Sequence, residues 1–466
     1  MAQVKPTLAK GTRDFSPVEM EKRNHIFNTL RAIFRKYGYN EIQTPSFENL
    51  STLTGKYGEE GDRLIFKILN SGDYLAKASA DLLADKNSLK LVPQISEKAL
   101  RYDLTVPFAR YVVMHQNDIT LPFKRFQIQP VWRADRPQRG RYREFYQCDV
   151  DVVGSPSLLN EAEFVLIYHE ALRALGLRDF DIKINNRKIL SGIAEVIGKP
   201  ELIVDMTVAI DKLDKIGLEG VNKELLERGF TDHDLTVLEP IILLAGTNTE
   251  KLHALKTVLA SSSVGLAGVA ELEEVFAYIH ALDTTGEVLT NTVEVDITLA
   301  RGLNYYTGCI FEVKTNEVQM GSIGGGGRYD DLTSMFGLKN LTGVGVSFGA
   351  DRIYDVLEEL GLFPDKSAAS TQVLICNFEK SLEMHTLPMV NRLRAQGIAA
   401  EMYPEPAKLK KQMTYADNKG IPFVWLVGEE EVKTNTIAVK DMKTGEQVIL
   451  EETAAIEKIR SSLSLG

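Results

Sequence analysis

The sequence has few of the residues from which disulfide frameworks and metal centres are built. It contains three cysteines among 466 residues, an odd number with no C-x-x-C spacing, so neither a set of disulfides nor a zinc site is expected. Its seven histidines are scattered, and no two of them form an H-x-x-x-H pair. A metal or nucleophilic site based on histidine therefore has little support.

Long hydrophobic runs are also missing. No apolar stretch is long enough to span a bilayer, and Met1 to Lys10 is too polar for a signal peptide. We therefore predict a cytoplasmic protein with no membrane partner. The length, with 44% hydrophobic residues, suits about three domains that each bury a core.

Positive charge is in deficit overall but concentrated in one place. The net charge of −10 argues against binding nucleic acid with the whole surface. Between Lys124 and Arg143, however, seven Lys and Arg residues accompany a single acid, Asp135. An acidic protein can bind RNA through such a local basic groove.

This basic segment has the alternation of two strands joined by a loop. Phe126 alternates with Gln127 in the first strand, and the polar face of the second also carries Phe145. The loop from Ala134 to Arg141 is longer and more basic than a hairpin requires. An amphipathic hairpin with a solvated outer face is the simpler alternative, but the pattern favours a binding surface for an anion.

The string RPQRGRYREFYQCDVDVVG resembles the second signature motif of class II aminoacyl-tRNA synthetases, in particular that of histidyl-tRNA synthetases. The resemblance implies that Arg133 holds the α-phosphate of ATP and the substrate carboxylate, that Arg141 reaches the outer phosphates, and that Phe145 stacks on adenine. Fixed guanidinium groups suit this chemistry, because negative charge develops at phosphorus when a carboxylate attacks it. By the same resemblance, Gln147 and Asp151 face the amino acid.

The loop of this motif is implied to contact tRNA. Arg136, Gln138 and Arg139 lie too far along it to share one phosphate with Arg133. In histidyl-tRNA synthetases the loop approaches the acceptor end, so these three residues are predicted to contact the acceptor end of the histidine tRNA.

Two segments before the hairpin fit the same resemblance. Ser16 to Glu19 reads as a capping box that starts a helix, which ends at Gly38 and is followed by a strand from Tyr39 to Thr44. Helix and strand resemble the first class II motif, which forms the dimer interface in the family and so implies a homodimer. An ordinary surface helix is the alternative.

The stretch from Arg101 to Pro107 alternates like a strand that ends at proline, with Asp103 and Thr105 on one side. A capped loop is an equally good reading of these residues. The resemblance implies that Asp103 and Thr105 contact the α-amino group of histidine.

Residues 187–287 are predicted to be helical and resemble the insertion domain of histidyl-tRNA synthetases.

The strand pattern that starts at Val293 ends in Arg301, and the segment resembles the first histidine-specific signature, R-G-L-D-Y-Y. Asn304 replaces its aspartate, so position 304 receives no catalytic role. The resemblance makes Arg301 a second catalytic cation at the α-phosphate.

The same signature supplies two aromatic residues, Tyr305 and Tyr306, which are implied to wall the imidazole pocket. A hydroxyl group and the Asp151 carboxylate would hydrogen-bond the ring nitrogens. Such a pocket rejects apolar amino acids because its own polar groups would be left unpaired.

Two glycine-containing segments complete the motifs. Gly324 to Leu332 resembles the second histidine signature, and its four glycines would let backbone approach a ligand closely; a flexible turn is the alternative. Thr342 to Leu357 resembles the third class II motif, a buried strand entering a helix with Arg352 in the first turn. A cation in the first turn is repelled by the positive end of the helix dipole. The position of Arg352 therefore favours a role in binding phosphate over a solvated side chain, and the resemblance implies that the ligand is the γ-phosphate.

After a linker from Gly361 to Ser370, strands and helices alternate in a smaller α/β unit. It resembles an anticodon-binding domain. Its charge is uninformative, because residues 371–466 contain 12 Lys and Arg against 13 Asp and Glu.

Together these motifs predict a fold and a function. The fold is an α+β class II synthetase catalytic domain, an antiparallel sheet flanked by helices, over residues 1–365, with the helical insertion and a C-terminal α/β anticodon-binding domain over 371–466. The resemblance implies a histidine–tRNA ligase that uses ATP with Mg2+ as its substrate complex, without a tightly bound cofactor or a metal site formed by the protein. Its partners would be histidine, the histidine tRNA and a second copy. A non-catalytic regulatory paralogue and a class II synthetase of neighbouring specificity remain the alternatives.

Overall fold

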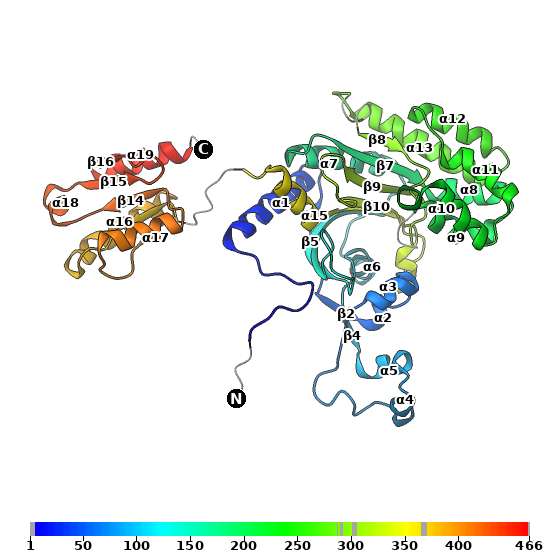
Figure 1. The fold of residues 1–466 in the computed structure, drawn as a ribbon, viewed down its shortest axis with the longest axis horizontal. Coiled ribbons are helices and arrows are strands. Elements are labelled where there is room, and N and C mark those ends of the chain that lie inside the picture. Colours follow the sequence, from blue (N-terminus) through cyan, green and yellow to red (C-terminus); the bar gives the residue numbers. More distant parts are fainter. Residues whose placement is uncertain (1–4, 287, 289–291, 301–304, 365–370, 465–466) are drawn as a thin grey trace. The chain divides into compact units, whose positions relative to one another are not determined.

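The computed structural model describes residues 5–286, 288, 292–300, 305–364 and 371–464 (Figure 1). The chain forms two compact units: residues 22–363 with 1–15, and residues 364–466 with 16–21. Each unit has its own hydrophobic core. Within the described ranges, no helix is long and apolar enough to cross a membrane.

The first unit is built on an eight-stranded sheet of order β1-β5-β6-β11-β10-β9-β7-β8. The six strands from β5 to β7 are antiparallel to one another, whereas the edge strands β1 and β8 run parallel to their neighbours. The predicted antiparallel sheet is therefore confirmed at its centre and is mixed at its edges. The strands are β1 (Asn40–Glu41), β5 (Phe123–Trp132), β6 (Glu144–Val153), β7 (Phe180–Asn186), β8 (Val293–Val295), β9 (Cys309–Thr315), β10 (Gly324–Arg328) and β11 (Gly343–Gly349).

One face of this sheet is apolar and covered by helices. The ring of Phe34 in α1 (Pro17–Lys36) lies 5.4 Å from that of Phe126 and 5.7 Å from that of Phe348, measured between centroids. Tyr168 in α7 (Leu159–Ala174) lies 4.5 Å from Phe348 in the same way. Helix α1 begins with the predicted capping box, in which Ser16 and Glu19 accept each other's backbone N–H groups.

The opposite face carries a ladder of polar pairs across β5 and β6. Arg125 stands opposite Asp151, Gln127 opposite Asp149, and Gln129 opposite Gln147. Arg125, Gln127 and both aspartates are at most 3% exposed. The hairpin therefore does not have an ordinary solvated outer face, and the polar alternation in its sequence marks the interior of a site.

Residues 187–282 form the predicted helical segment. Helices α8 and α13 cross so closely that a Cβ atom on Gly192 would collide with the backbone of Gly265, which explains glycine at both positions. The helices are α8 (Arg187–Val196), η1 (Pro200–Leu202), α9 (Ile203–Ile210), α10 (Leu213–Glu227), α11 (Asp232–Ile242), α12 (Asn248–Val258) and α13 (Ser263–Leu282).

Between β1 and β5 the chain forms a small three-stranded sheet of order β2-β4-β3 and short helices. The predicted strand from Arg101 to Pro107 is wrong: β4 ends at Leu100 and α6 begins at Thr105. Pro107 lies in the first helical turn, where its missing N–H needs no partner. The elements are β2 (Phe47–Asn49), α2 (Leu50–Leu53), α3 (Gly58–Leu64), β3 (Lys67–Ile68), α4 (Ala80–Ala84), α5 (Ser88–Ile95), β4 (Lys98–Leu100) and α6 (Thr105–Met114).

The second unit has a five-stranded sheet of order β13-β12-β14-β15-β16. The predicted parallel strands β12, β13 and β14 are present, and an unpredicted antiparallel pair, β15 and β16, extends the sheet. The elements are β12 (Val373–Ile375), η3 (Lys380–Leu382), α16 (Glu383–Ala395), β13 (Ala400–Met402), α17 (Leu409–Asn418), β14 (Phe423–Leu426), α18 (Glu429–Thr434), β15 (Ile437–Asp441), β16 (Gln447–Leu450) and α19 (Glu452–Ser464).

Candidate active site

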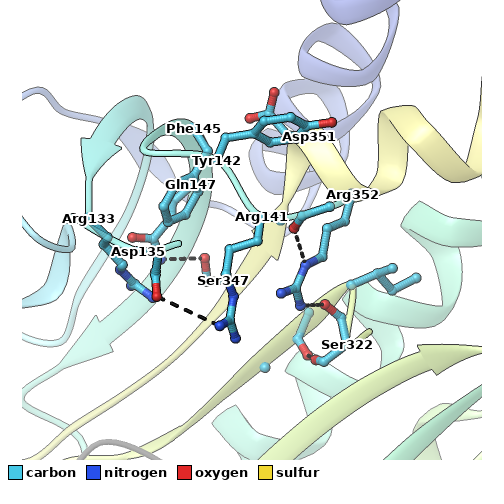
Figure 2. Close-up of a pocket in the computed structure, with 15 residues that line it drawn as sticks. Arg133, Asp135, Arg141, Tyr142, Phe145, Gln147, Ser322, Ser347, Asp351 and Arg352 are labelled. Atoms are coloured by element: carbon cyan, nitrogen blue, oxygen red, sulfur yellow. Dashed lines mark hydrogen bonds and ion pairs between the residues drawn. The ribbon is translucent and has the colours of Figure 1, made fainter. Parts of the chain in front are cut away.

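A cavity of about 270 Å³ opens over the polar face of the central sheet. It lies between the β5–β6 loop, β10, β11 and the start of α15 (Ala350–Leu360). Figure 2 shows Arg133, Arg141 and Arg352 converging on it from different sides. The lining comprises Arg133, Asp135, Gly140, Arg141, Tyr142, Phe145, Gln147, Ser322, Ile323, Gly324, Gly325, Ser347, Gly349, Asp351 and Arg352.

The three arginines have contacts that an anionic ligand can replace. Arg133 donates from Nε to the carbonyl oxygen of Tyr102 (3.1 Å), and Arg352 donates from Nε to that of Gly140 (2.8 Å). Arg141 has an ion pair with Asp135 at 3.8 Å. Burial, followed by the charges of Arg141 and Arg133, lowers the pKa of Arg352. Three cations around one cavity therefore repel one another until an anion enters.

Phe145 forms one wall of this cavity beside the arginines. The guanidinium carbon of Arg133 lies 5.2 Å from the Phe145 ring centroid and 4.3 Å from that of Tyr102, so the arginine is held between two aromatic rings. An aromatic wall next to converging cations suits a ligand that combines a flat ring with phosphates.

The four glycines of β10 belong to a strand that is paired on both sides, which rules out the flexible turn. A Cβ atom at Gly324 would lie 2.7 Å from Cε1 of Tyr168, and one at Gly327 would lie 2.7 Å from the carbonyl oxygen of Cys309. Close packing therefore requires glycine at these two positions. Gly324 and Gly325 also line the cavity, as close approach of a ligand to backbone would require.

Deeper in the same face lies a closed cluster of acids. Asp151 accepts a hydrogen bond from the Tyr329 hydroxyl (2.6 Å) and pairs with Arg125 at 2.9 Å. Asp149 accepts a long hydrogen bond from Gln147 (3.4 Å), which also donates to Ser347 Oγ (3.0 Å). The buried Arg125 guanidinium therefore pairs with Asp151, and its charge also acts on the buried Asp149 carboxyl.

Burial has a strong effect on these carboxyl groups. It raises the pKa of Asp149 to about 7; Arg125 opposes the rise and Asp151 adds to it. Burial likewise raises the pKa values of Asp151 and Asp103. Perturbed carboxyl groups gathered in one place are typical of functional sites.

Tyrosine hydroxyls surround Asp103. Its carboxylate accepts from Tyr57 (2.8 Å), from Tyr305 (3.2 Å) and from the backbone N–H of Val106 (3.2 Å), which caps helix α6. The Tyr305 hydroxyl also interacts with the Thr105 side chain. The structure thus brings the predicted pair Asp103 and Thr105 together at Tyr305, on a capped loop rather than on a strand.

Tyr306 stands next to this group, with its ring centroid 5.1 Å from that of Tyr305. Burial and then the charges of Asp149 and Asp151 raise its pKa. The predicted walls of the imidazole pocket therefore adjoin the predicted imidazole partner, Asp151.

Some predicted residues lie elsewhere. Arg301 and Asn304 lie outside the described residues. Arg136, Gln138 and Arg139 are exposed on the β5–β6 loop and do not line the cavity; Arg139 pairs with Glu359 of α15.

The sequence reasoning missed the buried partners of the acids: Arg125, Asp149, Tyr57, Tyr329 and Ser347. For Arg125 a signal was present, because aligning the two strands of the hairpin places it opposite Asp151. Tyr329 lies in the Gly324 to Leu332 segment that resembles the second histidine signature, but nothing in the sequence links this tyrosine, or Tyr57, to a particular acid.

The match to protein families covers both units. The histidyl-tRNA synthetase family matches residues 11–82 and 73–353, and the anticodon binding domain matches residues 372–462. The chain belongs to the histidyl-tRNA synthetase family.

Relatives within this family are similar over nearly their whole length. A histidine–tRNA ligase of Cytophaga hutchinsonii is 60% identical over 95% of this chain and 97% of its own, and one of Bacteroides fragilis is 59% identical over 96% and 97%. The crystal structure of a histidyl-tRNA synthetase from a Nostoc species superposes with a TM-score of 0.82 at 30% identity, covering 99% of this chain and 100% of the other.

Proposed function

We propose that this chain ligates histidine to tRNA. It would first join histidine to ATP, giving histidyl-adenylate and pyrophosphate, and then pass histidine to the terminal ribose of the tRNA. The observation that carries the proposal is the adjacency, on one sheet face, of a cationic cavity with an aromatic wall and a buried cluster of acidic side chains. Family membership and the relatives named histidine–tRNA ligase support it over a non-catalytic regulatory subunit.

The adenylation step makes one bond and breaks another. A carboxylate oxygen of histidine attacks the α-phosphorus, and the bond from that phosphorus to the bridging oxygen breaks, so pyrophosphate leaves. Arg133 would stabilise the charge at the α-phosphate, with Arg301 as the second cation. Arg141 and Arg352 would hold the outer phosphates, and Phe145 would stack on adenine. Magnesium would enter with ATP as part of the substrate.

The acidic pocket would receive the histidine side chain and ammonium group. Asp103, with Thr105 and Tyr305 around it, would bind the ammonium group, because a buried carboxylate attracts a cation that replaces its lost hydration. Asp151 would accept a hydrogen bond from the imidazole between the walls of Tyr305 and Tyr306. Gln147 connects the two regions and would face the amino acid.

The remaining proposals concern tRNA and assembly. Residues 1–365 would form the catalytic domain and 371–466 the anticodon-binding domain, with Arg136, Gln138 and Arg139 contacting the acceptor end. A homodimer is proposed from the resemblance and is tested by sedimentation equilibrium.

The loop assignment is tested by mutation. Replacing Gln138 or Arg136 with alanine should reduce tRNA charging far more than adenylation; equal losses in the two rates would contradict the loop assignment.

The function is tested by ATP–pyrophosphate exchange with each of the twenty amino acids in turn. Histidine alone should support rapid exchange. Exchange with a different amino acid would identify a synthetase of neighbouring specificity, and the absence of exchange with any amino acid would identify a regulatory protein.

A chain that stops at Ser370 should keep exchange, because every residue assigned to adenylation precedes that point, but should charge tRNA poorly. Full charging by the shortened chain would contradict the role of residues 371–466.

A further inference from the structure

The N-terminal segment Lys10–Phe15, here called the strap, contacts the elements that line the cavity without lining it. None of the motifs that carry the family resemblance includes it. Its contacts converge on the β5–β6 hairpin and on the start of α15, from which Arg133 and Arg352 project.

The first contact is a buried junction at Asp351, which directly precedes Arg352. One carboxylate oxygen of Asp351 pairs with Arg13 of the strap and with Arg23 of α1, the latter at 2.6 Å. The other oxygen accepts the backbone N–H of Tyr146 in β6 (2.7 Å). Asp351 is 3% exposed, so this one side chain ties the strap, α1, β6 and α15 together in a water-poor setting.

The second contact joins the strap to Arg133 through backbone. The carbonyl oxygen of Gly11 accepts from the N–H of Arg143 (2.9 Å), and the carbonyl oxygen of Arg143 accepts from the N–H of Arg133 (3.0 Å). Gly11 has a φ of +86°, and a Cβ atom there would lie 2.8 Å from Cγ of Arg143. Only glycine therefore lets the strap lie this close to the hairpin.

The third contact is a stack on the cavity wall. The guanidinium carbon of Arg13 lies 3.3 Å from the ring centroid of Tyr142, which lines the cavity. The Tyr142 hydroxyl donates to Asp355 of α15 (3.0 Å). Arg13 thus contacts both the hairpin and α15 and lies outside the lining of the cavity between them.

We propose that the strap positions the ATP-binding groups, with Arg13 as the positioning residue. By holding Asp351 and Tyr142, it fixes the spacing between Arg352 on α15 and Arg133 on the hairpin, the two cations that must bind different phosphates of one ATP. Together with Arg23, it neutralises the Asp351 carboxylate, which lines the cavity and would otherwise repel the triphosphate. The proposal rests on the proposed function, because it requires ATP in this cavity.

The test measures KM for ATP and for histidine separately in pyrophosphate exchange. Arg13→Ala should raise KM for ATP about tenfold, the usual effect of losing a charged hydrogen bond, and leave KM for histidine within about twofold. Arg13→Lys should give an intermediate KM for ATP, because it keeps the charge but loses the planar stack on Tyr142. Arg31→Ala is the matched control: Arg31 lies on α1 and pairs with Glu41 at 3.2 Å, away from Asp351.

Several outcomes would overturn the proposal: equal rises in both KM values for Arg13→Ala, no rise in either, or the same ATP effect from Arg31→Ala. If the alanine variant does not fold, Arg13→Lys decides by the same comparison of the two KM values. Wild-type protein that shows no histidine-dependent exchange would contradict the proposed function instead, so the two failures are distinguishable.

Discussion

The end of the candidate site that we propose for the phosphates of ATP, here called the phosphate end, is open and cationic, whereas the end proposed for histidine, the histidine end, is buried and acidic. At the phosphate end, Arg133 and Arg352 donate to backbone carbonyl oxygens. At the histidine end, Asp103 and Asp151 accept hydrogen bonds from tyrosine hydroxyls, and the buried Arg125 pairs with Asp151.

On the proposed assignment, the two ends of one sheet face bind groups of opposite charge. A guanidinium that donates to a carbonyl can exchange that weak partner for a phosphate at little cost, and so remains available. A buried carboxylate would be costly if it had no partner, so the tyrosines and Arg125 satisfy it before histidine arrives. At the phosphate end the arginines have no carboxylate partner at 3.5 Å or less within the described residues, whereas at the histidine end tyrosine hydroxyls and Arg125 already stabilise the carboxylates.

The largest effect should come from the phosphate end. Arg133→Ala should lower the pyrophosphate exchange rate by about 10²–10³-fold, because it removes a fixed donor to the charge that develops at phosphorus. Arg301→Ala should do the same. Circular dichroism should show an unchanged fold; exchange near the wild-type rate in either variant would remove that arginine from the catalytic step.

A change at the histidine end should affect both binding and stability. Asp151→Asn should raise KM for histidine by about tenfold or more with little change for ATP, and should lower the free energy of unfolding by about 3 kcal/mol, because Arg125 loses its buried counter-ion. Exchange kinetics and urea unfolding measure the two effects.

The double variant Arg125→Met/Asp151→Leu is the control for that prediction. It should recover most of the stability but not the histidine affinity. Neither member of the Arg125–Asp151 pair is left alone, and the nearby Asp149 stays protonated once the charge of Arg125 no longer lowers its pKa. Recovery of both would mean that Asp151 serves the fold and not the substrate.

The last prediction concerns the pH dependence of stability. Because burial raises the pKa of Asp149 to about 7, the folded protein binds a proton that the unfolded chain releases near the ordinary aspartate pKa. Wild-type stability should therefore fall, relative to Asp149→Asn, as pH rises from the ordinary aspartate range to about 7, and the difference should be constant above that. Urea titrations at several pH values measure it, with the exposed Asp81→Asn as control. A difference that does not vary with pH would mean that Asp149 has the same pKa in the folded protein as in the unfolded chain.

The sequence predicted the local structure around the candidate site well where chemistry and periodicity agree. Alternation placed Gln147 and Asp151 on one face of β6, and the strand-to-helix pattern placed Arg352 in the first turn of α15. It misread Arg101 to Pro107, because a short polar and apolar alternation fits a strand and a capped helix start equally well, and the Asp103 cap decided between them.

By itself, the sequence determined the strands and helix that carry the β5–β6 and α15 side chains of the candidate site and the residue types that could meet an anion, because these follow from local period and side-chain chemistry. The tertiary structure decided which acids are buried and what satisfies them. Tyr57 and Tyr329 reach Asp103 and Asp151 from 46 and 178 residues away, and Arg13 reaches Asp351 across 338 residues. Contacts over such separations arise only when the whole sheet has assembled, since no local pattern records which distant side chain will share a carboxylate.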